Sequence, residues 1–188
     1  MIYLVNFNGS GVSVVDTLPV GRRVVETMDW SPDGSLLAFG VANDSAFGEQ
    51  QIWTLTVPGG VLDTVTAPIN GAVDLQPVFS PDGTEILLQR RLPGCTDSGR
   101  YVITSASTGV ERVEIPTTVY CEGETDAGHD WSPDGTQIVL VDGSLSDANK
   151  VYVVPSTVTA ASYLKDRLLV GWPSGSLNAS SRNPSWRP

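Results

Sequence analysis

One acidic segment contains the side chains best suited to binding a metal ion. The stretch "YCEGETDAGHD" (120–130) brings Glu122, Glu124, Asp126 and His129 together. Hard divalent cations take carboxylate oxygens, so these four residues form a candidate cation site. Their spacing matches no calcium loop, because the pattern DxDxDG is absent. A solvated acidic loop, with the chain's single histidine as a hydrogen-bonding side chain, explains the same residues.

Catalysis by a nucleophile is not indicated. The stretch "GWPSG" (171–175) is not a nucleophile elbow, because its serine is not centred as in G-x-S-x-G. A Ser–His–Asp triad needs the single histidine beside a serine, and nothing in the sequence suggests this arrangement. Neither a phosphate-binding glycine loop nor zinc-type Cys/His spacing occurs. We therefore predict no catalytic residues, no cofactor and no enzymatic activity in this chain.

The charge balance argues against two classes of partner. The formal net charge is −10, and only 11 residues are lysine or arginine. Nucleic acids and anionic membrane surfaces both require clustered cations. The short pairs Arg22/Arg23 and Arg90/Arg91 are interpreted as solvated strand edges. No apolar run approaches the length of a membrane span, and the first residues lack the basic region of a signal peptide.

The elements that position these residues are indicated by a repeated turn. "WSPDG" occurs at 30–34 and 131–135, and "FSPDG" at 79–83, while "NPSWRP" supplies a fourth aromatic residue. These four aromatic residues, here called the markers, follow one another at intervals of 49, 52 and 55 residues. The structural repeat residues are Trp30, Pro32, Asp33, Gly34, Phe79, Pro81, Asp82, Gly83, Trp131, Pro133, Asp134, Gly135 and Trp186.

The residue types of the repeated turn suit a β-hairpin. Proline pre-sets φ at the first central position, aspartate tolerates the bridge region, and glycine takes the positive φ that leads into the next strand. This chemistry accounts for Asp33, Asp82 and Asp134 as turn residues rather than as a ring of catalytic carboxylates. Each marker is expected to pack in the core between adjacent repeats.

Short runs rich in Val, Ile, Thr, Tyr and Trp recur in step with the turns, as is typical of strands. One set follows the turns directly, at 35–40, 84–89 and 136–141. The next two sets lie at 1–7, 51–57, 100–106 and 150–156, and at 11–17, 60–66, 109–115 and 167–172. The only helical candidate is 159–166. One repeat is therefore four strands, named a to d, in which strand a ends at the marker.

Four antiparallel strands repeated at near-constant spacing predict an all-β fold made of β-propeller blades. The pattern "WSPDG", then an apolar strand, an Ile-Trp or Tyr strand and a glycine turn, resembles the WD-repeat-like blades of TolB-type propellers. The same blades occur in the propeller domains of prolyl-oligopeptidase-type peptidases. The resemblance covers essentially the whole chain. It is specific for the fold because the motif recurs in register, but it indicates little about function because propellers host many functions.

The strand count predicts a single domain over 1–188 with about three and a half blades, part of a larger propeller. Its repeats lie approximately at 1–28, 29–77, 78–129 and 130–184, with a final strand at 184–188. A four-bladed ring is an alternative, in which "PSWRP" joins the blade begun by "IYLVNF".

Blade topology places the a–b and c–d turns on one face and the b–c and d–a connections on the other. The first set is short. The second set is long and varied, at 41–50, 92–99, 142–149, 68–76, 116–129 and 173–183. Function is usually carried by long loops on a rigid frame, so we expect a protein partner to bind the second face.

The two cysteines permit one disulfide or two free thiols. Cys95 and Cys121 both fall in long connections of the same predicted blade, which favours pairing. A disulfide would indicate an extracytoplasmic protein, and the TolB-type resemblance also implies a periplasmic or extracellular location.

The resemblance and the missing catalytic residues together predict a TolB-like, non-catalytic scaffold for protein–protein interaction in the cell envelope. One alternative is the gating propeller of a prolyl-oligopeptidase-type serine peptidase, which needs a separate hydrolase domain. Another is a glycan-binding or lyase propeller with a metal in its central funnel.

Overall fold

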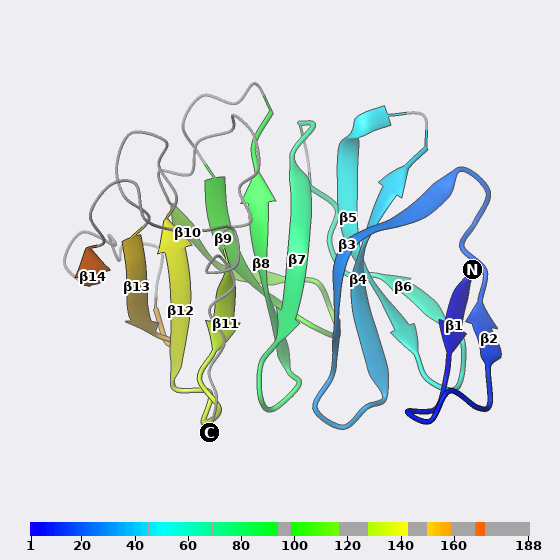
Figure 1. The fold of residues 1–188 in the computed structure, drawn as a ribbon. Helices are drawn as coiled ribbons and strands as arrows, with labels where there is room; N and C mark the ends of the chain where they lie inside the picture. Colours follow the sequence, from blue (N-terminus) through cyan, green and yellow to red (C-terminus); the bar gives the residue numbers. More distant parts are fainter. Residues whose placement is uncertain are drawn as a thin grey trace.

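The computed structural model describes residues 1–44, 46–68, 70–93, 99–116, 128–142, 150–158 and 168–171. These residues form fourteen strands and no helix, which confirms the all-β prediction. Figure 1 shows the strands in one row, from β1 and β2 at one end to β14 at the other. No helix that could span a membrane occurs in this part of the chain.

Twelve of the strands form three antiparallel blades, connected between the first and second blades by the parallel pair Gln50↔Val73. The first blade contains β3 (Arg22–Trp30), β4 (Leu36–Asn43), β5 (Ala46–Thr56) and β6 (Leu62–Thr64). The second contains β7 (Val73–Phe79), β8 (Glu85–Arg91), β9 (Gly99–Ser105) and β10 (Glu111–Pro116). The third contains β11 (His129–Trp131), β12 (Gln137–Asp142), β13 (Lys150–Pro155) and β14 (Leu168–Gly171). A separate two-stranded sheet pairs β1 (Ile2–Leu4) with β2 (Ser13–Asp16).

The cross-strand register is the same in all three blades. Each marker pairs with the residue three positions after the turn glycine, in the pairs Trp30↔Leu37, Phe79↔Ile86 and Trp131↔Ile138. Strands b and c repeat their own register in the pairs Phe39↔Trp53, Leu88↔Val102 and Leu140↔Tyr152. Since a slip of one residue would turn every side chain to the other face, this agreement shows that the blades are true structural repeats.

The core lies between the blades, and two markers are part of it. Trp131 clusters with Leu87 and Tyr101 of the second blade, and its indole N–H donates to the carbonyl of Val78 at 3.2 Å. Phe79 likewise clusters with side chains of the first blade, including Ile52. Both markers are only 5% exposed. Burial of such a side chain contributes about 1.5–3 kcal/mol, so each marker stabilises the contact of its blade with the preceding one.

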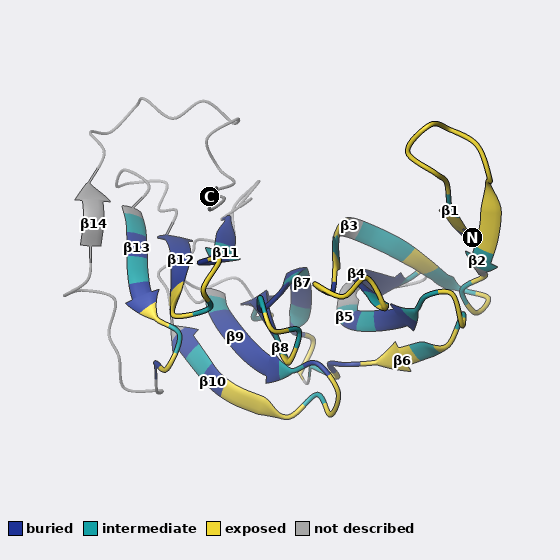
Figure 2. Cartoon of the chain, turned by 90° about the horizontal axis from the view of Figure 1, so that it is seen from below, coloured by how far each residue is buried: buried dark blue, intermediate teal, exposed yellow. Residues whose placement is uncertain are grey.

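The prediction that every marker is a core residue is wrong for Trp30, which is 43% exposed. The other two markers pack against strands b and c of the preceding blade. On that side of Trp30 the described residues provide only the sheet of β1 and β2, which corresponds to strands c and d. Figure 2 shows that much of this end of the molecule is exposed. Trp30 therefore has the marker position of its blade, but among the described residues no strand b covers it.

Strand boundaries follow the sequence closely at the a–b turns, but two predicted long connections are shorter than expected: β7 begins at Val73, inside 68–76, and the second case is 41–50. Residues 41–50 were expected to form a long b–c loop, but β4 and β5 continue into this region and pair Asn43 with Ala46. The apolar run of β4 includes Gly40, Val41 and Ala42, and only residues 44–45 separate β4 from β5. The predicted strand at 167–172 corresponds to β14, whereas the helical candidate at 159–166 lies outside the described residues.

Candidate functional site

The three Ser-Pro-Asp-Gly turns have one hydrogen-bond pattern. In the first, Asp33 Oδ1 accepts the Ser31 hydroxyl at 2.7 Å and the backbone N–H of Ser35 at 3.0 Å. The Ser31 hydroxyl oxygen in turn accepts the N–H of Leu36 at 2.8 Å. The same contacts recur around Asp82 and Asp134. The turn glycines have φ values of 71°, 73° and 69°, in the left-handed region that favours glycine.

These hydrogen bonds keep the turn carboxylates ionised. The hydroxyl of Ser31, followed by the N–H and hydroxyl of Ser35, lowers the pKa of Asp33 to about 2. Ser132 and Thr136 do the same for Asp134, whose pKa is also about 2. The pKa of Asp82 is lowered by equivalent bonds, with the Ser80 hydroxyl contributing most. The three aspartates therefore act as turn anchors, and at neutral pH none of them is a proton donor.

The turns of adjacent blades touch one another, in a row along one rim of the molecule. A β-carbon at Gly83 would lie 3.4 Å from Cδ of Pro32, and one at Gly135 would lie 3.7 Å from Cδ of Pro81. We call this the short-turn rim, since it carries the a–b and c–d turns. The opposite rim, which carries the b–c and d–a connections, is the long-connection rim. In Figure 1 the short-turn rim is at the bottom of the molecule.

A cleft of about 780 Å³ opens at the short-turn rim between the second and third blades. It is lined by Ser80, Pro81, Asp82, Glu85, Arg112, Trp131, Asp134, Gly135, Ser156, Thr157 and Val158. The sequence interpretation placed the working surface on the other rim and did not identify this cleft. In the sequence, the signal that could have indicated this cleft is the presence of the charged residues Glu85 and Arg112.

Arg112 reaches the cleft because the register shifts between Glu111 and Val113 in β10. Such a bulge re-aims the side chain of the extra residue. The Arg112 guanidinium donates to Glu85 at 2.5 and 3.0 Å and to the carbonyl of Ser156 at 2.8 Å. Arg112 thus connects the second blade to the third, and its charge is neutralised by Glu85.

The corresponding junction between the first and second blades has a different chemistry. Leu36 occupies the position of Glu85, and it packs against the apolar cluster around Phe79. The pairing of β5 with β6 has no register shift, so no side chain is re-aimed there. Among the described residues, the charged pair Glu85 and Arg112 is therefore a feature of the second junction, where Arg112 also binds the third blade.

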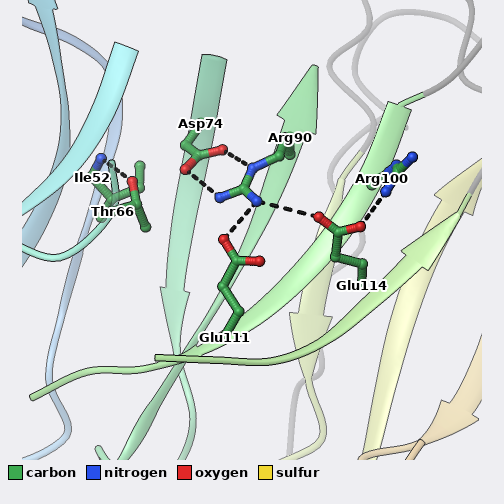
Figure 3. A network of polar contacts seen from close by, with 7 residues as sticks. All are labelled: Ile52, Thr66, Asp74, Arg90, Arg100, Glu111 and Glu114. Carbon is green, nitrogen blue, oxygen red and sulfur yellow. Dashed lines mark hydrogen bonds and ion pairs between the residues drawn. The ribbon is translucent and has the colours of Figure 1, made fainter. Parts of the chain in front are cut away.

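A second polar feature is the ionic network of the second blade, drawn in Figure 3. Arg90 is 7% exposed, and its guanidinium donates to both oxygens of the buried Asp74, at 2.7 and 2.9 Å. It also contacts Glu111 at 2.6 Å and Glu114 at 3.3 Å. Arg100 is ion-paired with Glu114 at the edge of the network. The interpretation of Arg90 as a solvated strand edge is wrong, because its register opposite Asp74 turns it inward.

The network holds a charge inside the protein by surrounding it with opposite charges. Burial lowers the pKa of Arg90, but hydrogen bonds and charge from Asp74 and then Glu111 outweigh this effect and raise it above its ordinary value. A buried ion pair is costly to break, because the remaining charge is left in a poorly solvated place. Arg90 therefore has a structural role within the blade.

Asp29 joins the innermost strands of two blades. Its Oδ2 accepts the backbone N–H of Phe79 at 2.8 Å. Burial raises the pKa of Asp29, the N–H groups of Phe79 and Trp30 lower it, and the charge of Asp130 raises it further. The net pKa of Asp29 is above the ordinary value, in contrast to the lowered pKa values of the three turn aspartates.

The predicted cation site is only partly covered by the described residues. His129 is 3% exposed in β11, where its Nε2–H donates to the carbonyl of Gln76 at 2.7 Å. Its ring lies edge-on to Tyr101 with centroids 5.2 Å apart. Glu122, Glu124 and Asp126 lie outside the described residues, so the site stays a prediction. Within the described ranges no three His, Cys, Asp or Glu side chains form a metal-binding group.

The remaining predicted residues are also outside the described part of the chain. Cys95 and Cys121, the predicted disulfide, fall there, and so does the fourth marker, Trp186. Their pairing and their position in a closing blade stay predictions. Most of the long-connection rim also lies outside the described residues, which do not include 94–98, 117–127 and 143–149.

Comparisons with known proteins identify the fold. No protein-family model and no curated protein matches the chain. Among solved structures, TolB from Acinetobacter baumannii is 18% identical over 90% of this chain, with a TM-score of 0.57. A putative TolB from Agrobacterium tumefaciens is 21% identical over 83% of this chain, also with a TM-score of 0.57. A prolyl endopeptidase structure is 17% identical over 90% of the chain, with a TM-score of 0.61.

The matched regions are parts of longer chains. The chain spans 37% and 52% of the two TolB structures and 26% of the prolyl endopeptidase. At this level of identity a structural match establishes the fold, and function has to be argued from sites. The described strands, their common register and these similarities together show that the chain consists of β-propeller blades of the kind found in TolB.

Proposed function

We propose that this chain is a non-catalytic β-propeller scaffold that binds a protein partner through its long-connection rim. One observation carries the proposal: the a–b turns of the repeated frame have one length, whereas the connections on the opposite rim differ. The a–b turns are the same five residues long in each blade, at 31–35, 80–84 and 132–136. The connections of the other rim differ in length between blades, from a tight turn after Asn43 to the segments 92–98 and 117–128. Variable loops on a rigid frame are the usual place for recognition.

A TolB-like role in the cell envelope is part of the proposal. It is supported by the "WSPDG" repeats and by the structural similarity to TolB from two bacteria. The periplasmic or extracellular location follows from the same resemblance, and a Cys95–Cys121 disulfide would agree with it.

The charge of the chain indicates the chemistry of the partner. With a net charge of −10, the chain attracts proteins that present a basic surface. Electrostatic complementarity of this kind increases the association rate more than the affinity. We therefore expect binding that weakens as salt is added, since exposed charges are screened over about 8 Å at physiological ionic strength.

Affinity capture from an envelope extract, using purified chain 1–188 as bait, tests the proposal. The first variant replaces 92–98 with a Gly-Ser linker of equal length. The matched control replaces two exposed apolar residues of the short-turn rim, Val61→Ser and Val110→Ser, which are 56% and 67% exposed. Loss of a defined partner in the first variant alone, with unchanged circular dichroism, supports the proposal. Equal capture by both variants, or loss only in the control, would contradict it.

A second candidate is the propeller of a prolyl-oligopeptidase-type peptidase, favoured by the similarity to a prolyl endopeptidase with a TM-score of 0.61. That role requires an α/β-hydrolase domain with a G-x-S-x-G serine in the same protein. Sequencing the gene on both sides of this segment separates the candidates. A hydrolase domain would support the peptidase, and further Ser-Pro-Asp-Gly repeats without one would support the scaffold.

A further inference from the structure

The cleft between the second and third blades has an apolar part that reaches the core. Trp131 and Val158 line it, and both also belong to the cluster that joins these two blades. Pro81 adds a third apolar side chain to the lining. The volume of about 780 Å³ lies in the range of small-molecule sites, which are mostly apolar with a few placed polar groups. The cleft is therefore large enough for a ligand with an aliphatic part.

The charged part of the lining has an excess of carboxylates. The turn of the second blade contributes Asp82 and the turn of the third contributes Asp134, so each blade supplies one. Arg112 is the cation among the described lining residues, and its guanidinium is already paired with Glu85, at 2.5 and 3.0 Å. Asp82 and Asp134 are both ionised at neutral pH, since hydrogen bonds within their turns lower the pKa of each. Two negative charges in the described lining therefore have no countercharge there.

Each of these two carboxylates binds its own turn through one oxygen. Oδ1 of Asp82 accepts three hydrogen bonds within the turn, at 2.6, 3.0 and 2.9 Å. Oδ1 of Asp134 accepts the same three, at 2.6, 3.0 and 2.8 Å. In the first turn Oδ2 is engaged as well, because Oδ2 of Asp33 accepts the hydroxyl of Ser35 at 2.9 Å. Among the described residues no such bond reaches Oδ2 of Asp82 or Asp134, so both oxygens can accept from a ligand while the turns stay intact.

We propose that the cleft binds a linear aliphatic diammonium ion. Its two ammonium groups donate to Oδ2 of Asp82 and Oδ2 of Asp134, and its methylene chain packs against Trp131 and Val158. An ammonium group is a compact charge with three rotatable donors, which suits a single carboxylate oxygen. A guanidinium group is matched instead to both oxygens of one carboxylate, and here one oxygen of each is held by the turn. The site lies on the short-turn rim, so it is separate from the surface proposed to bind a protein partner.

NMR titration of labelled chain 1–188 with 1,5-diaminopentane at neutral pH tests the proposal. We expect saturable shifts of the Trp131 indole N–H and of the backbone N–H groups of Asp82 and Gly135, and weaker binding as salt is added. Pentylamine has one charge and should bind about two- to fivefold more weakly, because a partly exposed ion pair contributes little. The uncharged 1,5-pentanediol should not shift these signals at the same concentrations. No saturable shift with diaminopentane, or equal affinity for diaminopentane and pentylamine, would overturn the proposal.

Substitutions that remove charge separate the site from the turns that carry it. Asp82→Asn and Asp134→Asn keep an oxygen for the turn, and each should weaken diaminopentane binding about two- to fivefold. Asp33→Asn makes the same change in the turn that does not line the cleft, so this matched control should keep the parental affinity. Arg112→Gln leaves Glu85 without its cation and should strengthen binding by a similar factor. An equal loss of affinity in Asp33→Asn, or a loss in Arg112→Gln with an otherwise unchanged backbone spectrum, would contradict the assignment.

Discussion

Asp33 and Asp134 hold the same bonds in two different blades, and each has a pKa of about 2. The turn residues could be predicted one by one, since proline, aspartate and glycine each satisfy a local backbone requirement. The inward position of Arg90 could not be predicted in this way. It depends on the register that sets Arg90 opposite Asp74, sixteen positions away along the chain, and no local pattern specifies that both faces of β8 are buried.

The turn carboxylates make the free energy of unfolding depend on pH in the acidic range. Their pKa values in the folded protein lie below the ordinary value of 3.8, so they stabilise the fold fully above about pH 4. This contribution is lost as the pH falls from about 4 to about 2. The double variant Asp33→Asn/Asp134→Asn should show a smaller decrease in unfolding free energy over this range than the parent, measured by urea titration at each pH. Val110→Ser, at an exposed residue without a titratable group, is the control and should keep the parental slope.

The ion pair of the second blade gives another residue-scale prediction. Asp74→Leu leaves Arg90 buried without its bidentate partner, which typically costs about 3–5 kcal/mol. The double variant Asp74→Leu/Arg90→Met removes both charges and should recover most of this loss, because an apolar pair needs no compensation. Urea unfolding of the two variants measures the difference. Equal stability of the single and double variants would show that the network does not hold the charge in the way proposed.

At the scale of the strands, the exposure of a marker decides how much it stabilises. Phe79→Ala removes a side chain that is 5% exposed, and such core truncations cost about 3–5 kcal/mol. Trp30→Ala should cost clearly less, since Trp30 is 43% exposed despite the identical turn that follows it. Chemical unfolding of both variants checks this. A larger loss for Trp30→Ala than for Phe79→Ala would mean that Trp30 is covered in solution.

The strands themselves were largely predictable, because short β-branched and aromatic runs between repeated turns specify both their position and their order. The exceptions have physical reasons. The sequence at 41–50 contains Asn, Asp and Gly, which are typical of loops, yet pairing of β4 with β5 continues through it. The exposure of Trp30 depends on what lies beside it in space, and a marker has the same local sequence whether or not a blade covers it.

On the scale of the whole molecule, the blades stack so that the a–b turns are uniform, whereas the b–c and d–a connections vary in length. The repeat period predicted the propeller fold, because a radial stack of similar four-stranded sheets lets every repeat bury the same face. The cleft between the second and third blades was not predictable, since it depends on one bulge that directs Arg112 toward Glu85 and the third blade. The repeat says least about function. The connections that differ between blades lie outside the repeated turn, so the turn pattern does not specify their sequence or their partner.

The most direct test of this account is an NMR measurement of nuclear Overhauser effects on uniformly labelled chain 1–188. The account predicts cross-strand backbone contacts at Trp30–Leu37, Phe79–Ile86 and Trp131–Ile138, together with a contact from the indole N–H of Trp131 to Val78. A register shifted by one residue in any blade, or a Trp131 ring in contact only with its own blade, would contradict it.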